Sequence, residues 1–392
     1  MAEPARNLCG AALAQALCDS RATTWSRVND LSDAQWSVPQ QPGLNLIAWE
    51  LAHIAWFAEF WVLRGPHARV ADGTARAALP PRHAGPDEHL DSSRLAHAAR
   101  WRTPLPSRER LVEMLQGQLE ACVDAVSDGQ ADDAALYFQR LVLFHEDMHA
   151  EAFAWLRATL AYAAPAGLAL APVAAQAEPL RVRGGSVEIG RAAGTTGFAF
   201  DNEAPPREVM LADFEIDTAP VTAGQFLRFV DAGGYDEPRF WPGAAGAWRA
   251  TSALPHPQRW RFDQTNGWQT RWFDRWLPLD PALPVIHINT FEAEAYCRWA
   301  RRRLPSAAEW ECAAPRMQWG RSVWEWTADV FQPYPGFVPG PYREYSAPWF
   351  GDHRELRGGA FATHARLHDT HYRNFFEPQR TDVFAGFRSA AL

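Results

Sequence analysis

Apolar residues recur at helical spacing through most of the first 162 positions of the chain. In the stretch 141–156, one helical face carries Leu141, Phe144, Met148, Ala152 and Trp155. Comparable stripes predict helices over residues 4–36, 44–63, 107–126 and 132–162. The second of these is apolar nearly all round, which indicates burial among other helices. We therefore expect a four-helix bundle with one long connection at residues 66–107.

The pattern changes after residue 162. Residues 163–178 are rich in Ala and Pro and poor in charge, which is typical of a linker. From residue 179 to 392, long helical stripes give way to Gly, Trp and Pro and to short β-like runs, with one short helix expected near 291–301. The chain is therefore predicted to be a two-domain α+β protein: a helical bundle over 1–162, a linker over 163–178 and a mixed α/β domain over 179–392.

Composition narrows the classes of function. The formal net charge of −8 argues against nucleic acid as a main partner. All 38 basic residues are arginine, which excludes a Schiff-base lysine, a pyridoxal-phosphate lysine and a P-loop lysine. The five cysteines show no C-x-x-C spacing and are typical of a reducing compartment. Neither a signal peptide nor an apolar run of about 20 residues is evident, so we expect a cytoplasmic protein without a membrane partner.

Two histidines in the stretch 141–156 are the first candidates for chemistry. His145 and His149 lie four positions apart, so their imidazoles share one helical face and could supply two adjacent metal ligands. The spacing alone is weak evidence, because His364 and His368 repeat it elsewhere in the chain. A third ligand must come from another element. His53 lies in the apolar second helix, where a lone histidine is more often a hydrogen-bonded core residue than a ligand.

Several runs of the second domain, in the same order, resemble the formylglycine-generating-enzyme-like (sulfatase-modifying factor) domain, a C-type-lectin-like fold. They are RGGSVEIG, FDNEAPPREVML, DTAPVTAGQFLRFV, LPVIHINTFEAEAYCRWARRRLPSAAEWE, SVWEWTADVFQPYPGF, LRGGAF and FAGFR. The first domain, with its HxxxHxE run at 145–151, resembles a DinB-like four-helix bundle. A DinB-like bundle placed ahead of this C-terminal domain is the arrangement of the ergothioneine sulfoxide synthases and of the related selenoneine synthases.

The resemblance implies a metal centre in the bundle. His53, His145 and His149 would be the three ligands of a non-haem Fe(II), so His53 becomes the missing third ligand. Three neutral imidazoles leave up to three positions open on such a metal. These positions could hold O2, the imidazole of one substrate and the thiolate or selenolate of the other, which an oxidative reaction would join. Glu151 is expected to orient one histidine through its other ring nitrogen.

The resemblance also implies which residues meet the substrates. A tyrosine of the C-terminal domain acts as proton donor in the family, and the motif match falls on Tyr342 in PYREYSAPWF, with Tyr345 as the alternative. Asn374 matches the asparagine that contacts hercynine, the trimethylated histidine substrate. Met148 stands where some relatives carry glutamine.

The expected donor pocket departs from the mycobacterial type of ergothioneine enzyme. Phe375 and Phe376 stand where that type has a Trp-Asp pair, whose aspartate helps to hold γ-glutamylcysteine. An aromatic face suits a quaternary ammonium through cation–π attraction. Arg380 aligns with an arginine that meets the carboxylate of the thiol donor, and here it could instead hydrogen-bond sugar hydroxyls.

These features favour a selenoneine synthase, an Fe(II)- and O2-dependent enzyme, monomeric or homodimeric, that couples C2 of the hercynine imidazole to a selenosugar. One alternative is an ergothioneine sulfoxide synthase that uses γ-glutamylcysteine or cysteine, and another is a DinB-type metal-dependent thiol transferase or hydrolase. A lectin-like binding module would leave the three histidines unexplained. A formylglycine-generating enzyme is excluded, because no copper-binding cysteine pair follows Cys312. We expect a structural or surface role for the cluster His364, His368 and His371.

Overall fold

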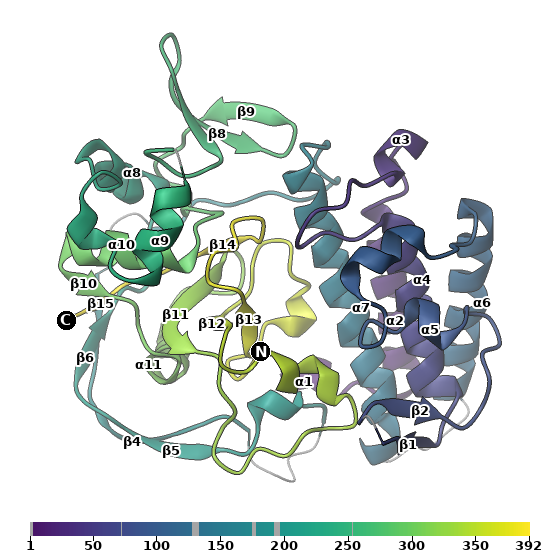
Figure 1. The fold of residues 1–392 in the computed structure, drawn as a ribbon. Helices are drawn as coiled ribbons and strands as arrows, with labels where there is room; N and C mark the ends of the chain where they lie inside the picture. The colour runs from purple at the N-terminus through teal and green to yellow at the C-terminus, as the bar shows by residue number, and fades with distance from the viewer. Residues whose placement is uncertain (1–2, 72, 128–132, 175–177, 192–196, 253) are drawn as a thin grey trace. The chain divides into compact units, whose positions relative to one another are not determined.

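The computed structural model describes residues 3–71, 73–127, 133–174, 178–191, 197–252 and 254–392 (Figure 1). Two compact units divide the chain, Met1–Leu156 with Thr196–Ala199 and Arg157–Thr195 with Phe200–Leu392. The first is dominated by helices and the second combines helices with small sheets, which confirms the predicted α+β class. The domain limits at 162 and 179 stay predictions. Asp132, the expected start of the fourth helix, and linker residues 175–177 lie outside the described residues.

Four long helices form the first unit: α2 (Gly10–Ser26), α4 (Ile47–Ala58), α6 (Arg108–Ser127) and α7 (Asp133–Thr159). Helix α6 packs against both α2 and α4. Every residue of α4 except Ala48 is buried, as its all-round apolar pattern predicts. Within the described residues, no helix combines the length and apolar content that a membrane span requires.

The prediction of one continuous helix over residues 4–36 is wrong. The chain forms α1 (Glu3–Arg6), α2 and α3 (Asp33–Trp36) instead. Helix α3 begins at a capping box, in which the Ser32 side chain accepts the Gln35 N–H and the Gln35 side chain accepts the Ser32 N–H. This local capping chemistry starts a new helix where the apolar stripe alone suggested continuation.

A buried arginine joins three helices of the bundle. Nε of Arg21, on α2, donates to Oε1 of Glu146 on α7 at 2.7 Å. Its Nη2 donates to Oε1 of Gln118 on α6 at 2.7 Å, and its Nη1 donates to the carbonyl oxygen of Leu115. Because Glu146 directly follows His145, this ion pair fixes the part of α7 that carries the candidate ligands.

The long connection at 66–107 is more regular than its sequence indicates. It contains the hairpin β1 (His67–Arg69) and β2 (Ala75–Ala77), then α5 (Asp87–Leu90) and a 3-10 turn (His97–Arg102). Before it, α4 continues into a π-helical turn (Glu59–Leu63). The buried Glu59 carboxylate accepts the backbone N–H groups of residues 82, 83 and 84 at 2.7, 2.6 and 3.1 Å, which holds the connection against the bundle.

In the part of the second unit that the structure describes, there are four small sheets and four α-helices. One sheet has the order β10-β15-β6-β3, from β10 (Arg302–Arg303), β15 (Ala390–Ala391), β6 (Phe214–Ile216) and β3 (Leu180–Val182). A second has the order β13-β12-β11-β14, from β13 (Asn374–Phe376), β12 (Arg354–Arg357), β11 (Trp324–Val330) and β14 (Ala385–Gly386), with β11 and β14 parallel. The hairpin β4 (Gly185–Ile189) and β5 (Arg207–Leu211) and the meander β7 (Trp260–Asp263), β8 (Gly267–Trp272) and β9 (Arg275–Pro278) complete the sheets. The helices are α8 (Ala223–Asp231), α9 (Ala244–Thr251), α10 (Thr290–Ala300) and α11 (Ala307–Ala313).

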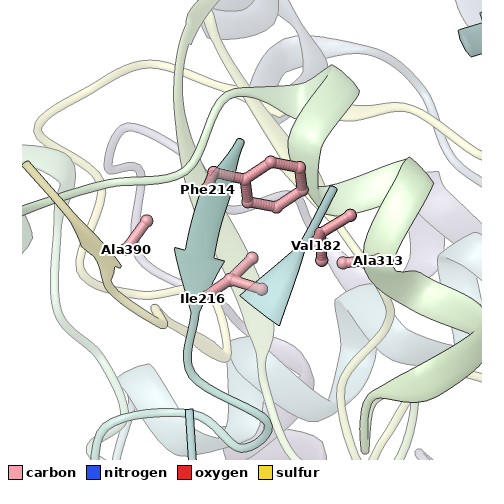
Figure 2. Packing of buried hydrophobic residues seen from close by; sticks show 5 residues of the cluster. All are labelled: Val182, Phe214, Ile216, Ala313 and Ala390. Atoms are coloured by element: carbon pink, nitrogen blue, oxygen red, sulfur yellow. The ribbon is translucent and has the colours of Figure 1, made fainter. Parts of the chain in front are cut away.

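A compact apolar cluster lies between the first of these sheets and α11 (Figure 2). It joins β6, β3 and β15 to the helix through Phe214, Ile216, Val182, Ala390 and Ala313. Strands from both ends of the unit, β3 and β15, therefore share one core.

Buried ion pairs replace part of the apolar core of this unit. Arg388 and Glu325 are each 0% exposed, and Arg388 Nη2 donates to Glu325 Oε1 at 2.6 Å. The second carboxylate oxygen accepts from Arg388 Nε and from Trp310 Nε1, the latter at 2.8 Å. A planar guanidinium can meet a carboxylate with two parallel hydrogen bonds, which suits burial better than an ammonium group would.

We predict that Glu325→Gln lowers the free energy of unfolding of the second unit by about 3–5 kcal/mol, because it leaves the Arg388 charge buried without a counter-charge. Urea unfolding followed by tryptophan fluorescence measures the change. Glu237→Gln is the control, because Glu237 and its partner Arg239 are exposed, and we expect a change within about 0.5 kcal/mol. Equal effects of the two substitutions would contradict the prediction.

Candidate metal centre

Three histidines from two bundle helices converge. His53 of α4 and His145 and His149 of α7 each place a ring nitrogen within 4.8 Å of the other two. Nε2 of His145 and Nε2 of His149 are 3.2 Å apart. Two ligands at right angles on a metal, each about 2.1 Å from it, lie about 3.0 Å from one another. His145 and His149 therefore have the spacing of two ligands on one metal, and the His53 nitrogen lies within 4.8 Å of both.

Hydrogen bonds on the far side of two rings determine which nitrogen faces the cluster. Nδ1 of His53 lies 2.7 Å from the carbonyl oxygen of Leu90, which can only accept, so Nδ1 carries the proton. Nδ1 of His149 donates in the same way to Oε1 of Glu50, at 2.7 Å. In a neutral ring, Nε2 then keeps its lone pair for a metal.

Burial keeps two of the candidate ligands uncharged. His53 and His145 are only 3% and 5% exposed. Burial, together with the neighbouring ring of His149, lowers the pKa of both imidazoles well below the usual value near 6.5. The neutral form, which is the form that binds metals, therefore persists into mildly acidic solution.

Aromatic rings fix the orientation of the same imidazoles. The Phe57 ring stacks on His145 with centroids 3.6 Å apart and planes at 7°. The Trp49 ring stacks on His53 at 4.9 Å and 9°, and the guanidinium of Arg100 lies 4.0 Å from the centroid of Trp49. These contacts limit rotation of the rings, so a metal meets ligands that are already in place.

The connection between α4 and α6 supplies the partner of His53. Leu90, whose carbonyl accepts from the ring, ends α5. That short helix is held by Asp87, which accepts from Arg64 Nη1 at 2.6 Å and from Trp56 Nε1 at 2.8 Å. The segment read from the sequence as a connection is thus part of the support of the site.

Glu50 is the residue at this site that the sequence analysis missed. It precedes His53 by three positions, so both side chains lie on one face of α4, and this spacing was the available signal. Glu151 was expected to orient a histidine; it is buried on α7, and that role stays a prediction. Met148 is half-buried one position before His149, and its contact with a substrate also stays a prediction.

Three of the expected substrate residues of the second unit lie on β13, and Arg380 lies in the loop that follows it. Asn374 pairs in register with Leu356, Phe375 with Glu355 and Phe376 with Arg354 of β12. Because side chains alternate along a strand, Asn374 and Phe376 share one face and Phe375 points to the other.

The two phenylalanines have different neighbours. The Phe375 ring stacks on Phe331 with centroids 4.2 Å apart. The guanidinium of Arg380 lies 5.0 Å from the ring centroid of Phe376. Arg380 is in turn paired with Asp382, a residue to which the sequence analysis assigned no role.

The two candidate tyrosines differ in their surroundings. Tyr342 is half-buried directly before the 3-10 turn Arg343–Tyr345, and its ring centroid lies 6.2 Å from that of Tyr345. The Tyr345 hydroxyl lies 3.0 Å from the hydroxyl of buried Tyr372, and burial together with that contact raises its pKa well above the usual value near 10.

The three late histidines make structural contacts. His371 Nδ1 lies 2.7 Å from Oε1 of Glu311, and this carboxylate raises the pKa of His371. His368 packs against Gly359, where an added Cβ would lie 2.5 Å from the ring, and burial lowers the pKa of His368 to about 4. The His364 ring accepts the N–H of Arg366 at 3.2 Å. These contacts agree with a structural role.

Comparison with known proteins agrees with this arrangement. Residues 16–181 match the DinB superfamily, and residues 168–322 and 317–391 match the sulfatase-modifying factor enzyme 1-like domain. The hercynine oxygenase of Mycolicibacterium thermoresistibile is 32% identical to the chain, over 97% of this chain and 94% of that protein. The chain belongs to the hercynine oxygenase family. The predicted family and both predicted domain types are thereby confirmed.

Other members of the hercynine oxygenase family and a more distant relative are also similar. The hercynine oxygenase of Mycobacterium tuberculosis is 31% identical, over 96% of this chain and 98% of that protein. The ergothioneine biosynthesis protein 1 of Schizosaccharomyces pombe is 25% identical, over 49% of this chain and 27% of that protein.

We predict that Glu50→Gln weakens Fe(II) binding about 10- to 100-fold, because a neutral amide no longer supports the N–H of His149 with a charged acceptor. Anaerobic competition with a chelator measures the affinity, and a thermal melt checks the fold. Glu113→Gln is the control, since it makes the same substitution in an exposed carboxylate of the bundle, which pairs with Arg110 on α6 at 2.8 Å. Unchanged Fe(II) affinity in Glu50→Gln would contradict the prediction.

Proposed function

We propose that this chain is a non-haem Fe(II)- and O2-dependent enzyme that joins C2 of the hercynine imidazole to a chalcogen donor, with a selenosugar as that donor. The observation that carries the proposal is the buried three-imidazole cluster in a member of a family whose relatives are named hercynine oxygenase. Neutral imidazoles suit iron, zinc, copper and nickel alike, so the ligands fit Fe(II), and the relatives' oxygenase name favours iron among these metals.

The proposed reaction joins C2 of the imidazole to the chalcogen, and the broken C–H and chalcogen–H bonds release two electrons and two protons. O2 accepts these together with two further electrons of the chalcogen, which keeps one oxygen atom as its oxide, while the other oxygen atom leaves as water. Iron held by His53, His145 and His149 would supply the binding and reduction of O2. The Leu90 carbonyl and the Glu50 carboxylate keep the ring protons of His53 and His149 on the side away from the metal. The rings of Trp49 and Phe57 cover His53 and His145 and limit the access of water to these two ligands.

We assign the proton-donor role to Tyr342. A phenol is protonated at neutral pH and can deliver a proton when reduced oxygen requires one. The hydroxyl of the alternative, Tyr345, is already shared with Tyr372 at 3.0 Å, which favours Tyr342.

We assign one hercynine contact to Asn374 on β13 and another to Met148 on α7. An amide can hydrogen-bond the carboxylate or the imidazole of this substrate. Phe375, stacked on Phe331, would support this strand from its other face.

The donor assignment rests on the absence of an acidic side chain at Phe376. In the mycobacterial type of enzyme an aspartate at this position helps to hold the amino-acid part of γ-glutamylcysteine. A phenylalanine cannot hold that ammonium group through an ion pair, whereas its ring suits the apolar face of a sugar. We further propose that the enzyme acts in the reducing cytoplasm, because its five cysteines are free thiols. We also propose that it is a monomer or a homodimer.

The test is turnover of hercynine by the iron-loaded full-length protein in air, with selenoglucose and γ-glutamylcysteine offered in separate reactions. We expect a product mass that contains hercynine and selenium with the first donor, and little product with the second. Product from γ-glutamylcysteine alone would show that the chain acts in ergothioneine synthesis instead. Product without O2 would favour a metal-dependent transferase instead.

Two variants test the residue assignments in the same assay. His149→Ala should abolish turnover together with iron binding. Tyr342→Phe keeps the ring and loses only the O–H, so it should keep hercynine binding and lose product formation. Full activity of either variant would contradict the assignment of that residue.

A further inference from the structure

The guanidinium of Arg380 is held by a neighbouring carboxylate beside the face of Phe376. Nε of Arg380 donates to Oδ1 of Asp382 at 2.8 Å, and Nη2 donates to Oδ2 at 2.5 Å. Both side chains are 18% exposed, so water reaches the pair only in part. Two parallel hydrogen bonds fix the plane of the guanidinium and cancel its charge locally.

The loop that carries this pair is anchored at both ends. The turn 377–380 closes through the Arg380 N–H, which donates to the Glu377 carbonyl at 3.1 Å, and the Pro378 carbonyl accepts the N–H of Thr290 at the start of α10, at 3.0 Å. Beyond it, the carbonyls of Thr381 and Val383 each lie 3.1 Å from Nδ1 of buried His287. Asp382 is thus clamped between two fixed residues.

His287 is a specialised support for this clamp. Its backbone lies in the left-handed region, with φ 62°, which is uncommon for a residue other than glycine. Nε2 of its ring lies 3.1 Å from Nη1 of Arg259, an obligate donor, so Nε2 accepts and Nδ1 carries the proton toward the two carbonyls. The ion pair therefore stays in one geometry before any ligand arrives.

A fixed, neutral pair of this kind discriminates by charge. A donor with a carboxylate would have to compete with Asp382 for the guanidinium or lie beside a like charge, which is costly in a half-buried site. A neutral polyol meets no such penalty. Its hydroxyls can donate to the Asp382 oxygens and accept from the Arg380 N–H groups, while the adjacent ring of Phe376 covers its C–H face.

We propose that Asp382 is a specificity-determining residue, which holds Arg380 in a neutral pair beside Phe376 and so selects a neutral polyol donor over a thiol that carries a carboxylate. This inference rests on the proposed function, because it assigns the donor site to this face of β13. It adds a residue and a physical cause to the choice between the two donor classes.

The test is Asp382→Asn in the full-length, iron-loaded protein. The amide keeps the shape of the side chain but removes the negative charge that pairs with Arg380. We expect the ratio of kcat/KM for selenoglucose to that for γ-glutamylcysteine to fall about 10- to 100-fold. Anaerobic calorimetry, which does not depend on turnover, should show weaker binding of 1-thioglucose and tighter binding of γ-glutamylcysteine. Asp382→Glu, which keeps the charge, should restore the original preference.

Asp217→Asn is the matched control. It makes the same substitution in another half-buried pair of the unit, in which Asp217, directly after β6, meets Arg302 of β10 at 2.8 Å. This variant should leave the donor ratio unchanged. A donor ratio in Asp382→Asn equal to that of the wild type and of this control would overturn the inference.

Arg380→Gln gives a second test if Asp382→Asn does not fold. This variant removes the positive charge and keeps the negative charge of Asp382, so binding of γ-glutamylcysteine should weaken further. Tighter binding of γ-glutamylcysteine by this variant would refute selection by charge.

The inference and the proposed function fail in different ways. Absence of any product from hercynine in the wild type would refute the function, while the anaerobic binding comparison would still decide whether Asp382 selects by charge. Hercynine turnover with an unchanged donor ratio in Asp382→Asn would refute only the role of Asp382.

Discussion

The burial of uncharged imidazoles is the constraint on which the metal site depends. A buried ring must remain neutral to bind a metal, and its second nitrogen must have a partner, because an unpaired polar atom in the bundle interior is costly. The Leu90 carbonyl meets this requirement for His53, and the Glu50 carboxylate meets it for His149. The connection that carries Leu90 and the helix that carries Glu50 are therefore as much part of the site as α7.

Arginine–carboxylate pairs organise both units in a chain without lysine. In the bundle, Arg21 and Glu146 fix α7 beside His145. In the second unit, Arg388 and Glu325 replace apolar packing at the centre of the domain. The pair at the proposed donor face follows the same chemistry, since a guanidinium held by two hydrogen bonds combines a fixed shape with a cancelled charge. The same kind of arginine–carboxylate pair thus stabilises the interior of the second unit and, by our proposal, selects the chalcogen donor.

The sequence predicts the parts of this protein that depend on local pattern. The apolar stripes located α4, α6 and α7, and the i, i+4 spacing put His145 and His149 on one face. The break at Ser32 was missed, since capping overrides a continuing stripe. The partners of the ligands could not be read, because Leu90 acts through a backbone carbonyl that leaves no trace in side-chain identity. The role proposed for Asp382 could not be predicted either, because it depends on the contacts that hold its loop. His287, which is distant in sequence, makes two of these contacts.

The most direct test of the account is an anaerobic titration of Fe(II) and then hercynine into the metal-free full-length protein. The account predicts one Fe(II) per chain and hercynine binding at least about tenfold tighter to the iron-loaded protein than to the metal-free protein, because the substrate imidazole gains a metal-centred site. A variant with His53, His145 and His149 all replaced by alanine should lose both effects. Iron binding by that variant as tight as in the wild type would contradict this prediction. So would a wild-type affinity for hercynine that iron does not change.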